Sequence, residues 1–293
     1  MTNIPIFLSS DNNYAPFVAT TIASICDNTR SFCEFYVLDG GITEENRKKI
    51  YSLNKKFNNF SLEFINIDTE KEFSSINYKN DCRHVTISTY NRLLIPKLKP
   101  DIKKCIYLDV DLIVLDNIKT LFDYDLNKFT IGAVEDFESN IRNRDFIVSE
   151  HKYFNAGVLL INCKKWQQEN VTQEIFELET KYREQLKFAD QDLLNKYFEN
   201  NYKNLPQKFN VISPTENTEI AIRHYAGDLK PYFFQKNIKT IFCPNIKEFW
   251  NYVYMSNFEK EINLFVKPKE EQNALIRNLR ILSLVSKETK INE

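Results

Sequence analysis

Apolar and amphipathic segments alternate along the first part of the chain. Three apolar segments of strand length cover residues 4–9, 34–38 and 62–67. Between them, apolar residues recur at helical spacing over residues 14–27 and 43–57. Strands that alternate with helices at this spacing form right-handed βαβ units. The pattern therefore predicts an α/β fold with a mostly parallel, Rossmann-like central sheet and flanking helices.

The pattern after residue 68 is less regular, and no internal repeat, low-complexity block or linker interrupts it before about residue 263. We therefore expect one domain over residues 1–262 and a separate tail over residues 263–293. Within the domain we expect a loop over 73–80, a polar flap over 135–150, strands over 105–115, 129–134, 153–162 and 220–225, and helices over 86–94 (ended by Pro96), 164–183 and 190–200.

The tail contains an apolar segment that predicts a helix over residues 273–286. Six basic side chains stand against four glutamates in residues 265–293, which is a small excess for attraction to anionic lipids. Peripheral contact with a membrane, docking on the domain and dimerisation all remain open for this helix.

Two carboxylates interrupt the most apolar segment of the chain. Asp109 and Asp111 lie in the middle of residues 105–115, which otherwise predict a buried strand. Burying two like charges side by side is costly unless a cation compensates them. A divalent metal is the natural candidate, because hard cations prefer carboxylate oxygens.

The same Asp-x-Asp spacing occurs twice more and has less weight there. Asp123 and Asp125 lie in a polar stretch that predicts a solvated turn, and a third pair begins at Asp190. Polar residues also follow the first two predicted strands, at Asp11 and Asp39. Ligands bind beyond the carboxyl ends of the strands in parallel sheets, so these positions support a site at that edge.

Composition excludes several classes of protein. There are 39 basic and 40 acidic residues, so no overall charge points to nucleic acid. Six cysteines without a close pair predict buried, reduced thiols. The N-terminal residues lack a signal-peptide pattern, and no segment approaches the ~20 apolar residues of a membrane span. We expect a cytoplasmic protein, with peripheral placement on the cytoplasmic face of the inner membrane as the alternative.

The few glycines and histidines narrow the chemistry further. With five glycines and no glycine-rich phosphate loop, metal and side-chain cations must neutralise any bound diphosphate. Of three histidines, His84 and His151 have polar neighbours, whereas His224 lies in an apolar segment. A lone histidine in such a segment is usually a core residue, but Gly227 and Lys230 follow it closely. An imidazole, a bare amide and an ammonium group together suit a metal-bound diphosphate.

With these motifs the sequence resembles the retaining glycosyltransferases of family 8, which have the metal-dependent GT-A fold, and in particular the bacterial lipooligosaccharide galactosyltransferases. Each motif is weak by itself, but they follow the family order from residue 4 to about residue 232. The matching segments are residues 10–15, 36–42, 83–86, 89–93, 107–111, 153–162, 190–195 and 224–227.

The resemblance implies a metal and nucleotide site. Asp109, Asp111 and His224 would bind Mn²⁺, or Mg²⁺, which would also contact both phosphates of UDP. The remaining nucleotide contacts would come from Asp11 and Asn13 on the uridine, and from Gly227 and Lys230 on the β-phosphate.

The resemblance also implies a hexose site. The sugar would be held by Arg92, Asn155, Asp190 and Gln191, with Asp136 beside them near the acceptor. Val110 and Ala156 belong to the same substrate-binding set, and Gln191, Asp190 and Lys230 would be the catalytic residues. Without the resemblance, Arg92 could be a surface residue, Asn155 a turn former and Asp190 a helix N-cap.

The implied reaction transfers galactose or glucose from UDP to a glycan or glycolipid acceptor of the lipopolysaccharide type. Mn²⁺ and Lys230 would stabilise the departing UDP. Because the neutral amide of Gln191 is a poor nucleophile, we favour front-face attack assisted by the departing phosphate over a double displacement.

The sequence departs from the family pattern in segments that cover donor and acceptor. The flap after Asp136 and the region over residues 211–223 are shorter, and Tyr232 stands where tryptophan is usual. The acceptor, and the choice between galactose and glucose, therefore stay open.

Two other functions are compatible with the motif. A haloacid-dehalogenase-type phosphatase also has Asp-x-Asp after a buried strand, but it wants Thr or Val where this chain has Ile113. A nucleotide-sugar-binding protein with an idle site is the non-enzymatic alternative.

Overall fold

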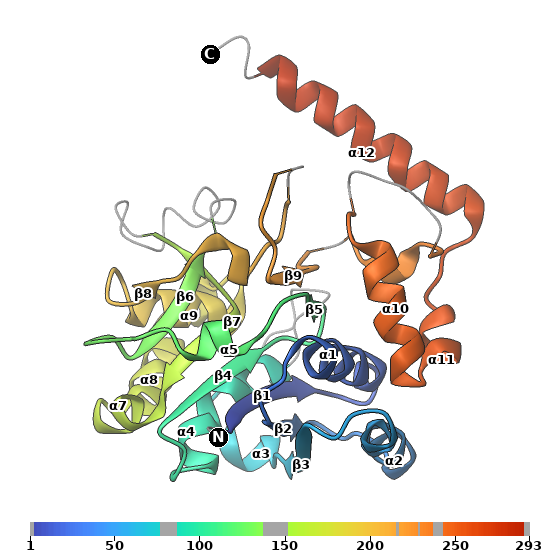
Figure 1. The fold of residues 1–293 in the computed structure, drawn as a ribbon. Coiled ribbons are helices and arrows are strands. Elements are labelled where there is room, and N and C mark those ends of the chain that lie inside the picture. The colour runs from blue at the N-terminus through green and yellow to red at the C-terminus, as the bar shows by residue number, and fades with distance from the viewer. Residues whose placement is uncertain are drawn as a thin grey trace.

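A seven-stranded sheet forms the centre of the computed structural model, which describes residues 3–76, 87–136, 152–214, 217–227, 229–236 and 243–289 (Figure 1). The strand order is β3-β2-β1-β4-β7-β6-β8. Its strands are β1 (Ile4–Ser10), β2 (Cys33–Asp39), β3 (Phe60–Asn66), β4 (Lys104–Leu108), β6 (Ile131–Glu135), β7 (Phe154–Asn162) and β8 (Lys203–Asn204).

The sheet is mostly parallel, as predicted. Strands β1 to β4 are parallel to one another, and β8 is parallel to β6. Only β7 is antiparallel, to both β4 and β6. The parallel half places the ends of β1, β2 and β4 at one edge, where Asp11, Asp39 and Asp109 follow or end the strands.

Helices cover both faces of the sheet, and the strands contribute to both cores because their side chains alternate between the two faces. Ile106 and Leu108 of β4 belong to one hydrophobic core with α1 (Ala15–Asn28) and α10 (Ile246–Ser256), whereas Cys105 and Tyr107 belong to the other. The second core includes α7 (Cys163–Gln168), α8 (Val171–Tyr182) and α9 (Ala189–Tyr197). The other α-helices described before α12 are α2 (Glu44–Tyr51), α3 (Thr69–Glu72), α4 (Ile95–Leu98), α5 (Lys119–Phe122) and α11 (Glu259–Asn263).

The prediction of one continuous strand over residues 105–115 is wrong. Strand β4 ends at Leu108, and β5 (Leu112–Val114) pairs instead with β9 (Ile222–His224) in a separate two-stranded sheet. The chain changes sheets across residues 109–111. This change lets two adjacent carboxylates leave the core, and it brings β9 beside them.

Three helix boundaries also differ from prediction. Pro96 does not end a helix but lies in the first turn of α4, where its missing N–H costs no hydrogen bond, after a 3₁₀ helix over Ile87–Leu94. The helix expected over residues 164–183 is divided into α7 and α8 at Asn170, which has a left-handed φ of 51°. The helix that Thr43 caps becomes 3₁₀ after Tyr51.

Helix α12 (Lys269–Thr289) extends beyond α10 and α11 (Figure 1). Its start docks on the domain: Gln272 is buried, donates to the carbonyl of Lys267 and accepts from the backbone N–H of Gln235. Leu275 and Ile276 pack against the core. Among the described residues no helix is long and apolar enough to cross a bilayer. Membrane contact and dimerisation through α12 stay predictions.

Candidate active site

The change of sheets holds the two carboxylates in place through the backbone. The N–H of Asp109 donates to the carbonyl of Gly157 on β7 at 2.8 Å, and the carbonyl of Asp111 accepts from the N–H of Tyr225 at 2.9 Å. Between them, the Thr21 hydroxyl of α1 lies 3.1 Å from the carbonyl of Val110. The turn is therefore tied to both sheets and to a helix.

Asp109, Asp111 and His224 converge at this turn. The Nε2 atom of His224 lies 3.1 Å from Asp111 Oδ1 and 3.9 Å from Asp109 Oδ2, and the three ligand atoms lie within 4.8 Å of one another. Two carboxylate oxygens and one imidazole nitrogen suit Mn²⁺ at least as well as Mg²⁺.

Gly157 provides the room for this cluster. A Cβ atom at this position would lie 2.3 Å from Cε1 of His224 and 2.7 Å from Oδ2 of Asp109. Its backbone is not left-handed, so lack of space is the reason for the glycine. The ligand side chains thus occupy space that an ordinary residue would fill, and the cluster fits a divalent metal.

Lys230 is the neighbouring cation. Its Nζ atom donates to Asp111 Oδ2 and to the carbonyl of Tyr225, both at 2.7 Å. Burial acts to raise the pKa of Asp111, but the ammonium group of Lys230 lowers it well below its ordinary value. Burial acts to lower the pKa of Lys230, but Asp111 raises it above its ordinary value. Lys230 therefore carries its charge beside the cluster.

Arg92 joins the metal ligands to a second group of polar residues. Its Nη2 atom lies 3.3 Å from Asp109 Oδ1, its Nε atom lies 2.9 Å from Asp190 Oδ2, and its Nη1 donates to the carbonyl of Ala156. The guanidinium stacks 4.5 Å above the ring of Tyr107, whose hydroxyl donates to Asp109. Arg92 is therefore buried and not the surface residue that the pattern alone allowed.

Asp190 is the buried anion of this group. Desolvation raises its pKa to about 6, and the guanidinium of Arg92 offsets only part of that effect. Phe188 is the N-cap of α9, so Asp190 is not the cap that the pattern allowed. Asn155 lies in β7 and not in a turn.

The amide of Gln191 is held on three sides. Its Oε1 accepts from the N–H of Ala156 at 3.0 Å and from Nδ2 of Asn155 at 3.1 Å, and its Nε2 donates to the hydroxyl of Tyr153 at 3.1 Å. Asn155 in turn accepts a hydrogen bond from Nδ2 of Asn210, and Oδ1 of Asn210 is hydrogen-bonded to Nδ1 of His224. The residues expected at the hexose are thus hydrogen-bonded to those expected at the metal.

The residues expected at the uridine, Asp11 and Asn13, lie just after the end of β1. Asp11 Oδ1 accepts from the backbone N–H groups of Asn13 and Tyr14 at 2.9 and 3.2 Å, so this carboxylate orders the start of α1. The ring of Phe17 in α1 packs against Tyr14 and against Tyr232, two residues after Lys230. The end of β1 therefore adjoins the Lys230 loop.

Gly227, Val110 and Asp136 differ in their surroundings. Gly227 has φ +83° and is exposed with open space around its Cα, so its N–H can approach a ligand closely. Val110 is buried within the turn. Asp136 follows β6, and its N–H donates to the carbonyl of Tyr153. Of the flap expected over residues 135–150, all but the first two residues lie outside the described residues, as do His84 and His151.

Sequence reasoning missed several residues that shape this site. Asn210 lies in a segment without a periodic pattern, and Thr21 is an ordinary buried position of a helix. Gly157 and Tyr153 lie in a matched motif, but only the packing reveals what they contact. A small residue and a tyrosine inside an otherwise apolar strand were the available signals.

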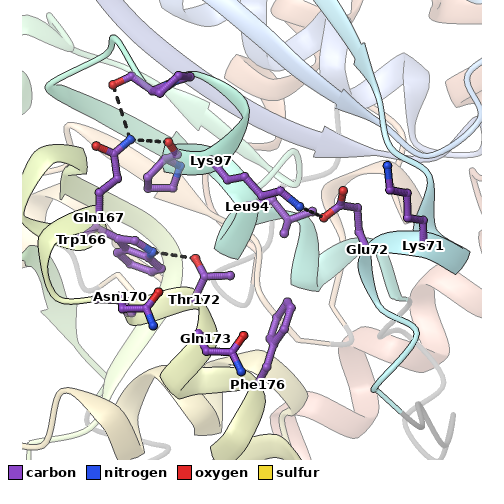
Figure 2. A pocket seen from close by; sticks show the side chains of 13 residues that line it. Lys71, Glu72, Leu94, Lys97, Trp166, Gln167, Asn170, Thr172, Gln173 and Phe176 are labelled. Atoms are coloured by element: carbon purple, nitrogen blue, oxygen red, sulfur yellow. Dashed lines mark hydrogen bonds and ion pairs between the residues drawn. The ribbon is translucent and has the colours of Figure 1, made fainter.

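A surface pocket of about 570 Å³ lies elsewhere, among α4, α7 and α8 (Figure 2). The polar groups of its lining pair with one another: Gln167 donates to the carbonyl of Pro96, and Trp166 donates to Thr172. None of its lining residues belongs to the metal cluster. It is not the site described above.

Comparison with known proteins gives concordant matches. The model of glycosyl transferase family 8 matches residues 5–235. General stress protein A of Bacillus subtilis is 31% identical over 209 residues, 69% of this chain and 71% of that protein. A lipopolysaccharide 1,2-glucosyltransferase of Escherichia coli is 26% identical, over 76% of this chain and 71% of that protein. A structure of the galactosyltransferase LgtC with donor and acceptor sugar analogs is 26% identical, with a TM-score of 0.74 over 92% of this chain and 99% of that chain.

Proposed function

Because this chain belongs to glycosyl transferase family 8, we propose that it transfers galactose or glucose from a UDP-sugar to a glycan or glycolipid acceptor of the lipopolysaccharide type. The observation that carries the proposal is the convergence of Asp109, Asp111 and His224 beside Lys230. Two anions with one buried lysine form a site for a cation and a diphosphate together.

The metal ligands would be Asp109, Asp111 and His224, with Mn²⁺ as the preferred ion and Mg²⁺ as the alternative. Such an ion would supply positive charge to the phosphates as the sugar–phosphate bond breaks. Lys230 would contribute a second positive charge, since its ammonium group is buried and already directed at Asp111. Gly227 would allow the diphosphate to approach the backbone. Asp11 and Asn13, at the adjoining end of β1, would hold the uridine.

The hexose would lie against the group around Arg92. The buried guanidinium of Arg92 keeps Asp190 ionised at neutral pH, so this ion pair presents fixed charges to the sugar hydroxyls. Asn155, Ala156 and Gln191 would border the same space, with Asp136 toward the acceptor.

For a transfer that retains the anomeric configuration, front-face attack is the route that we propose at this site. Both lone pairs of Gln191 Oε1 already accept hydrogen bonds, so this oxygen is a poor nucleophile for the anomeric carbon. Asp190 is paired with Arg92, and Asp192 accepts from Tyr153 and from two backbone N–H groups. The departing phosphate would then take the proton of the acceptor hydroxyl. Mass-spectrometric detection of a hexose covalently bound to one of these three residues would overturn this mechanism.

One assay tests the donor sugar and distinguishes the proposed transferase from the two alternative functions. Wild-type protein with Mn²⁺ and either UDP-galactose or UDP-glucose should release UDP slowly even without acceptor, and faster with lipooligosaccharide fragments. The preferred donor is the one that is hydrolysed faster. No release from either would favour an idle binding protein, and release of inorganic phosphate from phosphomonoesters would favour a phosphatase.

A further inference from the structure

A chain of hydrogen bonds connects the expected metal ligand His224 to the buried carboxylate of Asp192. From His224 Nδ1 it passes to Asn210 Oδ1 at 2.9 Å, and from Asn210 Nδ2 to Asn155 Oδ1 at 2.9 Å. It continues through Gln191 and Tyr153, whose hydroxyl donates to Asp192 Oδ1 at 2.7 Å.

Two backbone amides fix the direction of this chain. The N–H of Ala156 can only donate, so the Gln191 atom that faces it is the carbonyl oxygen. By the same argument the N–H of Gly157, 2.9 Å away, identifies Oδ1 of Asn155. The group of Asn210 that faces this oxygen must be its NH₂, which leaves Oδ1 of Asn210 directed at the ring of His224.

An amide oxygen can only accept, so Nδ1 of His224 must carry a proton. In the neutral ring Nε2 then has a lone pair, and this atom faces Asp111 Oδ1 at 3.1 Å. Two lone pairs at that distance repel each other unless a proton or a metal ion lies between them. The orientation of Asn210 therefore decides which nitrogen is available as a ligand.

We propose that Asn210 is a positioning residue for the metal centre, which holds His224 in the Nδ1–H tautomer and directs Nε2 at the space beside Asp109 and Asp111. The proposal rests on the proposed function only for the identity of the bound ion. Hydrogen-bond partners of metal-binding histidines typically change metal affinity 10–100-fold when removed. Asn210 is 1% exposed, so water cannot replace its amide freely.

The test reads the tautomer without metal. Protein labelled with ¹⁵N-histidine and stripped with EDTA is examined by ¹H–¹⁵N NMR, and the His224 signals are those missing in His224→Gln. Wild-type protein should show a protonated Nδ1. In Asn210→Leu we expect the proton on Nε2, or a mixture of the two tautomers. The Kd for Mn²⁺, measured by electron paramagnetic resonance, should rise about 10–100-fold.

Two further variants serve as controls. Asn210→Asp keeps an acceptor for Nδ1–H and should retain the wild-type proton position, which also tests the proposal if Asn210→Leu fails to fold. Asn91→Leu removes a buried amide that bonds Ser9 and does not belong to the chain, so its Kd for Mn²⁺ should stay within twofold of wild type.

Three results would overturn the proposal: an unchanged His224 tautomer in Asn210→Leu, an unchanged Kd in that variant, or an equal loss of affinity in Asn91→Leu. If wild-type protein binds no Mn²⁺, the proposed metal function fails. The tautomer measurement would still decide whether Asn210 positions the ring.

Discussion

Gly157→Ala should disable the metal centre by adding a single methyl group. The new Cβ would lie 2.3 Å from Cε1 of His224, whereas ordinary contacts begin at 3.4 Å, so the ring must move by about 1.1 Å (3.4 − 2.3). Metal–ligand distances tolerate about 0.2 Å. The ring is buried and hydrogen-bonded to Asn210, and Asp109 would also be crowded at 2.7 Å.

The magnitude follows from these contacts. Overpacking of a well-packed region costs about 1–3 kcal/mol of folding stability. A misplaced ligand should weaken Mn²⁺ binding by at least the roughly 10–100-fold that is typical of losing a ligand's hydrogen-bond partner. We therefore expect a moderate loss of stability and a much larger loss of metal-dependent UDP release.

Gly132→Ala is the matched control. It places a methyl group in the neighbouring strand β6, 2.9 Å from the end of the Leu126 side chain, which can rotate away. Urea unfolding measures stability, and Mn²⁺ titration followed by electron paramagnetic resonance measures Kd. The reasoning is refuted if Gly157→Ala binds Mn²⁺ as tightly as Gly132→Ala.

Three further predictions address charge and metal. The raised pKa of Asp190 means that its contribution to stability is present below pH 4 and is lost as the pH rises through about 6. Relative to Asp190→Asn, the unfolding free energy of wild type should fall by about 2.4 kcal/mol between pH 4 and 7, and equal pH profiles would contradict this. Lys230→Met should lower the unfolding free energy of the metal-free protein by about 3–5 kcal/mol and slow UDP release about 10²–10³-fold. It should also tighten Mn²⁺ binding, because a cation that competes for Asp111 is removed, and weaker Mn²⁺ binding would contradict this. Mn²⁺ at 100 times its Kd should raise the unfolding free energy of EDTA-treated wild type by about 2.7 kcal/mol, measured in urea, with no such increase in Asp109→Asn.

The sequence pattern was sufficient for the parallel half of the sheet and for the acidic pair. Alternating apolar and amphipathic segments have a direct local cause, and two carboxylates in an apolar segment require compensation wherever they lie. His224 was different: before the family resemblance only the nearby Gly227 and Lys230 distinguished it from a core histidine, because the two carboxylates beside it are more than 100 residues away.

The break between β4 and β5 could not be predicted locally. Leu112–Val114 is as apolar as a continuation of β4 would be, and only pairing with β9 separates it. Asn210 gave no signal for the same reason, since its function depends on two partners outside its own segment, Asn155 and His224. Contacts of this kind are properties of the packed structure and not of any window of sequence.

The most direct test of the metal centre is anomalous X-ray scattering from crystals soaked with Mn²⁺ and UDP. We predict a manganese peak about 2.0–2.3 Å from Nε2 of His224 and from carboxylate oxygens of Asp109 and Asp111, with the Lys230 ammonium at the β-phosphate. Bound UDP without a manganese peak between these three side chains, or a peak coordinated by other residues, would contradict the account.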